Sequence, residues 1–262
     1  MENYRTYGRP PYSVAVIHGG PGAAGSMAPV AMELSGSLGV LEPMQTAYSI
    51  DGQAIELHDL LRKHAALPVT LVGHSWGAWL SLIVAARYPF LVKKLILVGC
   101  APLEDKYAQA IIATRLSRMG DEETRSLLAL TAKLSDPNIA DKRAAFAQFG
   151  RLMADIDSYD RLPGPEPEVT LNEEINRSVG IEAEVMRSRG ELLNIARRVR
   201  CPVVAIHGDY DPHPSEGVEK PLSHCIKDFR LILLEKCGHE PWREKHAKSG
   251  FYRLLREELA GA

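Results

Sequence analysis

The sequence predicts an α/β fold: a mostly parallel sheet with helices on both faces and a helical segment inserted between two of its strands. Short apolar strand patterns alternate with helical patterns in residues 1–102, and again in residues 199–262. Because each strand pattern is apolar throughout, we expect strands that are buried on both faces, as in a parallel sheet. Residues 103–198 show only helical patterns, so we expect them to form a cap, or lid, over the carboxyl ends of the strands.

Each predicted element is a run with strand-like or helix-like spacing of apolar residues. The predicted strands are residues 13–18, 40–42, 68–73, 94–98, 202–207 and 229–234. The predicted helices are residues 27–35, 52–64, 76–88, 106–119, 121–134, 139–155, 182–199, 218–225 and 244–259.

Three local features refine these helices and connections. In the helix 52–64, the spacing places Ile55, Leu57, Leu60 and Leu61 on one apolar face. Pro89 ends the helix 76–88, because proline cannot continue it. Residues 135–137 separate two helices of the inserted segment, and the proline-rich residues 162–167 predict a rigid, extended linker.

The composition is that of a globular protein, and it excludes several partners. The chain has 262 residues, 45% hydrophobic and 24% charged, with a formal net charge of -2. This balance gives no reason to expect nucleic acid or an anionic membrane surface as a partner. We find no apolar run long enough to cross a bilayer, and residues 1–11 lack the apolar segment of a signal peptide. We therefore expect a cytoplasmic protein, with its oligomeric state left open.

The cysteines give no sign of a metal site. Cys100, Cys201, Cys225 and Cys237 show no CxxC spacing. We expect buried or free thiols in a reducing compartment, rather than disulfides or metal ligands.

A nucleophile is predicted at the turn after the strand 68–73. Gly73-His-Ser-Trp-Gly77 is a G-x-S-x-G motif placed between that strand and the helix that starts near Trp76. Such a turn must be very sharp, and the glycines two residues before and two residues after Ser75 remove side chains that would collide there. The alternative is an ordinary glycine-rich turn in which the serine is incidental.

A serine hydroxyl needs a base, and the base needs an acid that orients it. His239 follows the last predicted strand, and Asp211 follows the strand 202–207, so the chain order is Ser, Asp, His. Asp209 is the competing acid, although its short side chain also suits capping of the turn. His207 and His213 are competing bases on either side of the acid.

The sequence His18-Gly-Gly-Pro-Gly22 follows the first predicted strand and suits an oxyanion hole. Glycines at a strand end allow backbone N–H groups to point into a cavity. The N–H groups of Gly20 and Trp76 are therefore expected to stabilise the oxyanion of a tetrahedral intermediate. We also predict a cis peptide bond before Pro21. The alternative is a plain glycine-proline turn.

Together these residues resemble the α/β-hydrolase superfamily, over nearly the whole chain outside the helical insertion. Within it, HGGPG and the tryptophan after the nucleophile are similar to the prolyl iminopeptidases and their relatives, which cleave an N-terminal residue, usually proline. The resemblance implies Ser75, Asp211 and His239 as the triad, and Gly20 with Trp76 as the oxyanion donors. This chain has Leu41-Glu-Pro-Met-Gln45 where those peptidases commonly have Asp-Gln-Arg-Gly, and His74 where they usually have glycine. We expect their leading hairpin to be reduced or absent here.

The resemblance also implies that carboxylates of the cap hold the free amine of a peptide substrate. The candidates are Asp155, Asp157, Asp160, Glu173, Glu174, Glu182 and Glu184.

The sequence therefore predicts a serine hydrolase that acts on a small-molecule ester or amide through an acyl-enzyme, without cofactor or metal. An aminopeptidase of the prolyl iminopeptidase type is one candidate. A carboxylesterase, a thioesterase and a carbon–carbon bond hydrolase are alternatives, because each can use the same triad. A ligand receptor on a hydrolase scaffold is a further alternative, against which the intact triad argues.

Overall fold

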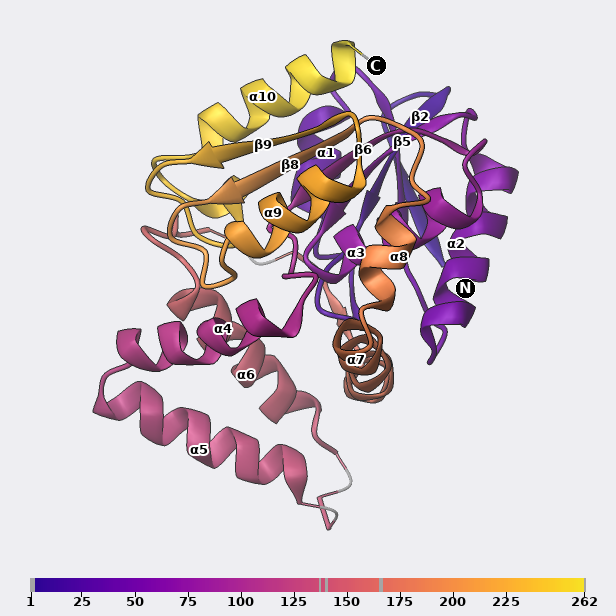
Figure 1. Cartoon of the computed structure of the whole chain (residues 1–262). Helices are drawn as coiled ribbons and strands as arrows, with labels where there is room; N and C mark the ends of the chain where they lie inside the picture. The colour runs from indigo at the N-terminus through magenta and orange to yellow at the C-terminus, as the bar shows by residue number, and fades with distance from the viewer. Residues whose placement is uncertain (1–2, 137, 140, 165–166, 262) are drawn as a thin grey trace.

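A seven-stranded sheet forms the centre of the molecule (Figure 1). The structure is a computed structural model and describes residues 3–136, 138–139, 141–164 and 167–261. All neighbouring strands pair in parallel, except that β1 is antiparallel to β4. In order of pairing, the strands are β1 (Tyr4–Tyr7), β4 (Gly39–Pro43), β2 (Tyr12–Ile17), β5 (Val69–His74), β6 (Val92–Val98), β8 (Val203–Gly208) and β9 (Phe229–Leu234).

Helices cover both faces of the sheet. Successive residues of a strand point to opposite faces, so Leu71 and Val72 of β5 belong to different apolar clusters. The cluster around Val72 contains α1 (Ala28–Leu34) and α10 (Lys248–Ala260). The cluster around Leu71 contains residues of α2 (Ile50–His64), α3 (Trp76–Arg87), α8 (Glu191–Ala196) and α9 (Glu216–Cys225).

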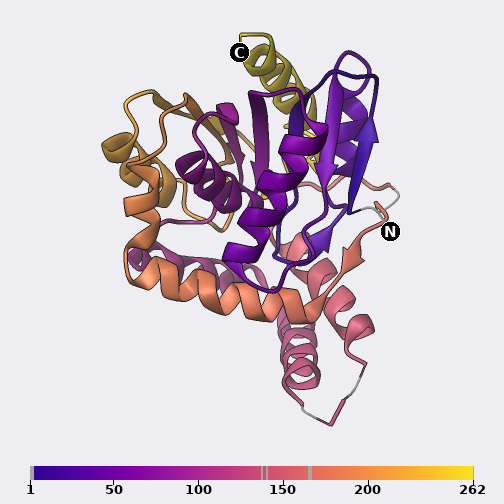
Figure 2. The ribbon, with the colours of Figure 1, turned by 90° about the vertical axis from the view of Figure 1, so that its right-hand side faces the viewer.

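The inserted segment between β6 and β8 is mainly helical. Figure 2 shows its middle part projecting away from the sheet. It consists of α4 (Asp105–Arg118), α5 (Asp121–Ser135), α6 (Arg143–Ile156), β7 (Thr170–Leu171) and α7 (Glu173–Ser188), followed by α8. β7 pairs with β3 (Ala23–Ala24), so the segment is tied to the loop that follows β2.

The α/β fold and the mostly parallel sheet are confirmed, and the predicted strands are all present. The prediction of one helix over residues 182–199 is wrong. Asn172 caps α7 by accepting a hydrogen bond from the N–H of Ile175 at 3.0 Å, and α7 begins at Glu173. α7 ends at Ser188 because Gly190 takes a left-handed conformation, with φ +68°, before α8 begins.

Other differences are local. Ile55 is 46% exposed, so its predicted place on the buried face of α2 is wrong, while Leu57, Leu60 and Leu61 are buried as predicted. β1 was not predicted, and it supplies one antiparallel strand at the edge of the sheet. Parts of the helix predicted over 139–155 and of the linker over 162–167 fall on residues 140, 165 and 166, outside the described residues. Across the described ranges, no helix combines the length and the apolar character needed to cross a membrane.

Candidate active site

Ser75 lies at the tip of a sharp turn between β5 and α3. Its backbone has φ +52° and ψ −114°, a conformation that a non-glycine residue rarely adopts. The turn is crowded on both sides: a Cβ on Gly73 would lie 2.3 Å from the carbonyl oxygen of Gly77, and a Cβ on Gly77 would lie 2.3 Å from that of Ile17. The glycines of the motif are therefore required by close backbone packing.

The loop after β2 lies directly beside the turn. A Cβ on Gly19 would lie 3.2 Å from the Cβ of Ser75. His18 is fully buried; its Nε2 accepts a hydrogen bond from the N–H of Gln45 at 3.3 Å, so its Nδ1 is left to donate to Gly19 O at 3.0 Å. Burial lowers the pKa of His18, so a neutral imidazole braces this loop.

Of the predicted oxyanion donors, Trp76 directly follows Ser75, and Gly20 follows Gly19, which approaches Ser75. Trp76 is the first residue of α3, where a backbone N–H has no partner within the helix. Gly20 takes φ +49°, and its carbonyl accepts a hydrogen bond from Asn176 Nδ2 of α7 at 3.1 Å. The prediction of a cis bond before Pro21 is wrong, because the cis bonds of the described chain precede Pro11 and Pro68.

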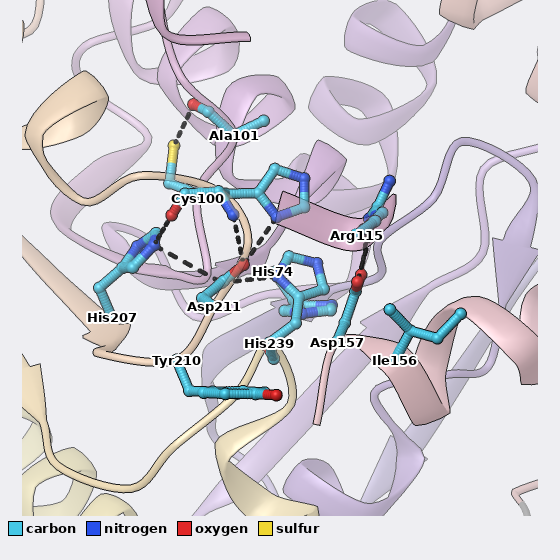
Figure 3. A network of polar contacts seen from close by, with 12 residues as sticks. His74, Cys100, Ala101, Arg115, Ile156, Asp157, His207, Tyr210, Asp211 and His239 are labelled. Atoms are coloured by element: carbon cyan, nitrogen blue, oxygen red, sulfur yellow. Dashed lines mark hydrogen bonds and ion pairs between the residues drawn. The ribbon is translucent and has the colours of Figure 1, made fainter. Parts of the chain in front are cut away.

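Asp211 and His239 meet in the loops after β8 and β9 (Figure 3). Oδ2 of Asp211 lies 2.7 Å from Nδ1 of His239, and the Asp211 side chain is fully buried. His74, the neighbour of Ser75, binds the carbonyl oxygen of His239 through Nε2 at 3.1 Å, and the two rings are 4.6 Å apart. These contacts bring the histidine loop to the turn that carries Ser75.

The competing acid binds the histidine loop, and both competing bases lie close to Asp211. Asp209 Oδ1 accepts a hydrogen bond from the backbone N–H of Cys237 at 3.2 Å, which ties the acid loop to the histidine loop. His207 is fully buried, and its Nε2 lies 2.7 Å from the carbonyl oxygen of His213. Nδ1 of His213 lies 2.7 Å from Oδ1 of Asp211, whereas His239 contacts the other carboxylate oxygen, Oδ2.

The carboxylate and the imidazoles shift one another's pKa values. Burial alone would raise the pKa of Asp211, but His239, His213 and His207 together lower it well below its usual range. Burial would lower the pKa of His239, but Asp211 outweighs burial and raises it. The pKa of His74 is lowered well below its usual value, first by burial and then by the charge of His239. An ionised Asp211 beside a basic His239 suits proton abstraction from a hydroxyl.

Two carboxylates support the histidine loop: Asp157, for which the sequence predicted a different role, and Glu244, which was not predicted. Asp157 forms a two-pronged ion pair with Arg115 of α4, at 2.8 and 2.6 Å, and its carbonyl oxygen accepts the N–H of His239 at 3.0 Å (Figure 3). Glu244 is fully buried and accepts the N–H groups of Gly238, Tyr159 and Asp160, each at 2.9 Å. No local pattern signals these contacts, because each joins residues at least six positions apart and most join residues far apart in the chain.

The predicted amine-binding carboxylates are mostly engaged elsewhere. Asp157 is held by Arg115, and Glu182 accepts the backbone N–H of Ile50 at 2.7 Å. Glu174 and Glu184 are exposed. The remaining three form ion pairs, namely Asp155 with Arg161, Asp160 with His246 and Lys245, and Glu173 with Arg177.

One cluster of the described residues has ligand atoms close enough for a metal ion. Asp211, His213 and His239 offer atoms within 4.8 Å of one another. The two hydrogen bonds of 2.7 Å to Asp211 account for this closeness.

Comparison with known proteins agrees with this fold. The family model described as "Alpha/beta hydrolase family" matches residues 11–248. The chain belongs to the alpha/beta hydrolase family, and the superfamily predicted from the sequence is confirmed.

Individual relatives have several named activities. The chain is 27% identical over 211 residues to a pimeloyl-[acyl-carrier protein] methyl ester esterase of Chromobacterium violaceum, covering 77% of this chain and 74% of that protein. It is 24% identical over 201 residues to a 2-(acetamidomethylene)succinate hydrolase of Mesorhizobium japonicum, covering 77% of this chain and 68% of that protein. It is 24% identical to the monoacylglycerol lipase abhd6-B of Xenopus laevis, covering 84% of this chain and 64% of that protein.

Among solved structures, VinJ is similar with a TM-score of 0.67 at 18% identity, covering 98% of this chain and 94% of that chain. E-2-(acetamidomethylene)succinate hydrolase is similar with a TM-score of 0.63 at 20% identity, covering 99% of this chain and 94% of that chain. At these identities the likeness establishes the fold.

Proposed function

We propose that the protein is a serine hydrolase that cleaves a small ester or amide through an acyl-enzyme intermediate. In this proposal Ser75 is the nucleophile, His239 the general base and Asp211 the acid that orients it. The hydrogen bond of 2.7 Å between Asp211 and His239, beside the turn that carries Ser75, is the observation on which the proposal rests. The names of the relatives, which include an esterase, a lipase and a hydrolase, support it.

In this proposal the acyl-enzyme forms first and is then hydrolysed. His239 takes the proton of Ser75 as its oxygen attacks the substrate carbonyl, and the N–H groups of Gly20 and Trp76 stabilise the oxyanion. His239 then gives the proton to the leaving group, and the acyl group stays on Ser75. Water then attacks the acyl group and gives its proton to His239, which returns a proton to Ser75 as the acid product is released. Because Nδ1 of His239 is bound to Asp211, Nε2 is the nitrogen that exchanges protons with Ser75 and the leaving group.

We further propose residues 103–198 as a cap over this site, and an ester as the preferred substrate. The carboxylates that would hold a peptide amine are largely engaged by other groups, Asp157 by Arg115 and Glu182 by the N–H of Ile50. The aminopeptidase of the prolyl iminopeptidase type remains the second candidate, on the strength of the HGGPG sequence and Trp76.

A substrate panel separates these candidates. Short and long acyl esters, an acyl thioester and aminoacyl amides that include a proline derivative are assayed with the wild type and Ser75→Ala. We expect turnover of at least one ester and its loss in Ser75→Ala. Turnover of the prolyl amide alone would favour the peptidase, and full turnover by Ser75→Ala would contradict Ser75 as the nucleophile.

A further inference from the structure

Asp211 contacts three imidazoles: His239 and His213 at 2.7 Å each, and Nε2 of His207 at 3.5 Å. Only His239 has a role in the proposed reaction. Oδ2 binds Nδ1 of His239, while Oδ1 lies 2.7 Å from Nδ1 and 2.9 Å from the backbone N of His213. The ring of His213 also stacks on the ring of His239, with centroids 4.5 Å apart and planes inclined by 26°. His213 therefore contacts both the acid and the base.

The charge of His213 matters because of this stacking. The ionisable groups near its ring are Asp211, His239 of the histidine loop, His74 at the end of β5 and Arg115 of α4. His207 of β8 contacts the backbone carbonyl oxygen of His213. Burial lowers the pKa of His213, and His239 and Arg115 lower it further, against the attraction of Asp211. A neutral His213 with its proton on Nδ1 donates to Asp211 and leaves the positive charge of the reaction to develop on His239 alone.

The side chain of Asp211 is fully buried, so bulk solvent does not reach it to replace a lost partner. Without the imidazole of His213, Oδ1 loses one of its two hydrogen bonds and keeps the backbone N–H of residue 213, so the carboxylate is held less firmly in its orientation toward His239. Loss of one hydrogen bond to a buried charged group is costly.

We propose that His213 is a positioning residue of this site: it holds Oδ1 of Asp211 and one face of the His239 ring, so that Oδ2 stays directed at Nδ1 of His239. This inference rests on the proposed function. It also implies that protonation of His213 stops turnover, because a second positive charge would then stack against His239 as that ring becomes charged.

The test compares two substitutions that separate the hydrogen-bond donor of His213 from its ring. His213→Asn keeps an N–H donor near Nδ1 but loses the ring, whereas His213→Phe keeps a ring but loses the donor. We expect His213→Phe to lower kcat by about 10- to 100-fold with little change in KM, and His213→Asn to recover most of that loss. His224→Asn, on the exposed surface of α9, is the matched control and should behave as the wild type.

The slope of log kcat/KM against pH distinguishes a positioning role from a purely structural one, which would leave this slope unchanged. The pKa of His213 is lowered whereas that of His239 is raised, so log kcat/KM of the wild type should have a slope of about one against pH between the two pKa values. Below the pKa of His213 the slope should approach about two, because two imidazoles must then lose protons. In His213→Asn the slope should be about one. Equal kcat and equal slopes in the wild type, His213→Asn and His213→Phe would overturn the positioning role.

Labelling and ester turnover of the wild type distinguish a failure of the proposed function from a failure of the positioning role of His213. If a fluorophosphonate labels Ser75 of the wild type and an ester is turned over, the function stands, and the His213 variants decide the inference. If the wild type neither reacts with the fluorophosphonate nor turns over any ester, both proposals are overturned.

Discussion

The serine at the end of β5 is held in a conformation that serine rarely adopts. A non-glycine residue with φ +52° costs about 1–3 kcal/mol, and it persists only where the surrounding structure fixes it. Here the strain is maintained by close packing: Gly73 and Gly77 approach each other, and Gly77 also approaches the backbone of β2. The arrangement places Ser75 at the carboxyl end of β5, directly after His74, which contacts the histidine loop.

A substitution at Gly77 should therefore destabilise the protein. In Gly77→Ala the new methyl would lie 2.3 Å from the carbonyl oxygen of Ile17, and backbone has to move. We expect a loss of about 3 kcal/mol or more in the free energy of unfolding, measured in urea. Gly150→Ala in α6 is the control, since nothing lies within 4 Å of its Cβ and alanine should stabilise the helix by about 0.5–1 kcal/mol. Equal stability of the two variants would contradict this account of the turn.

The pH dependence of catalysis follows from His239. Its imidazole must be neutral to accept a proton, and Asp211 raises its pKa above the ordinary value of about 6.5. Activity is therefore lost as pH falls through that raised pKa, and kcat/KM should reach half its maximum above pH ~6.5. In Asp211→Asn the loss of kcat/KM at acid pH should shift to lower pH, and kcat should be reduced by about 10³- to 10⁴-fold. A wild-type profile that is flat from about pH 5 to about pH 8 would be inconsistent with a histidine base.

At the scale of elements, the inserted segment supports the histidine loop through one ion pair. Arg115 of α4 holds Asp157, which follows α6, and the carbonyl oxygen of Asp157 accepts the N–H of His239. The side chains of Arg115 and Asp157 are 24% and 5% exposed, so the pair is largely shielded from water. Helices α4 and α6 are thereby linked to the loop that carries the proposed base.

Breaking this pair should affect both stability and rate. Asp157→Asn leaves the guanidinium of Arg115 without a charged partner, and we expect a loss of about 3 kcal/mol in the free energy of unfolding. We also expect kcat to fall, because the histidine loop loses a fixed support. The control is Asp141→Asn, which removes the partner of Arg143 in an exposed ion pair and should leave the urea midpoint and kcat unchanged. The same response in both variants would refute the supporting role.

Strands and helices could be predicted from the sequence where the local spacing of apolar residues determines them. The strands and most helices follow from apolar spacing, and α3 ends at Arg87, before Pro89, as expected. The start of α7 was missed because Asn172 caps it beside charged residues that carry little apolar pattern. Ile55 was misplaced because the buried face of α2 is centred on Ile50, Ala54 and Leu57, and this centre depends on where the helix meets its neighbours.

At the scale of the whole molecule, topology brings distant parts of the chain together. Parallel strands end at the same edge of a sheet, so the turn after β5 and the loops after β8 and β9 meet there. For this reason the sequence could pair Asp211 with His239. The sharing of Asp211 with His213 and the ion pair of Arg115 with Asp157 could not be predicted, because they depend on side-chain directions and on how the insertion lies.

The central claim is that Ser75, Asp211 and His239 act as one unit, and the rate of covalent labelling at Ser75 tests it most directly. The protein is incubated with a fluorophosphonate, the label is located by peptide mass spectrometry, and its rate is compared in the wild type, His239→Ala and Asp211→Ala. We predict rapid labelling of Ser75 in the wild type and a rate lower by about 10⁴-fold or more in both variants. Labelling at another residue, or unchanged labelling of Ser75 in His239→Ala, would contradict it.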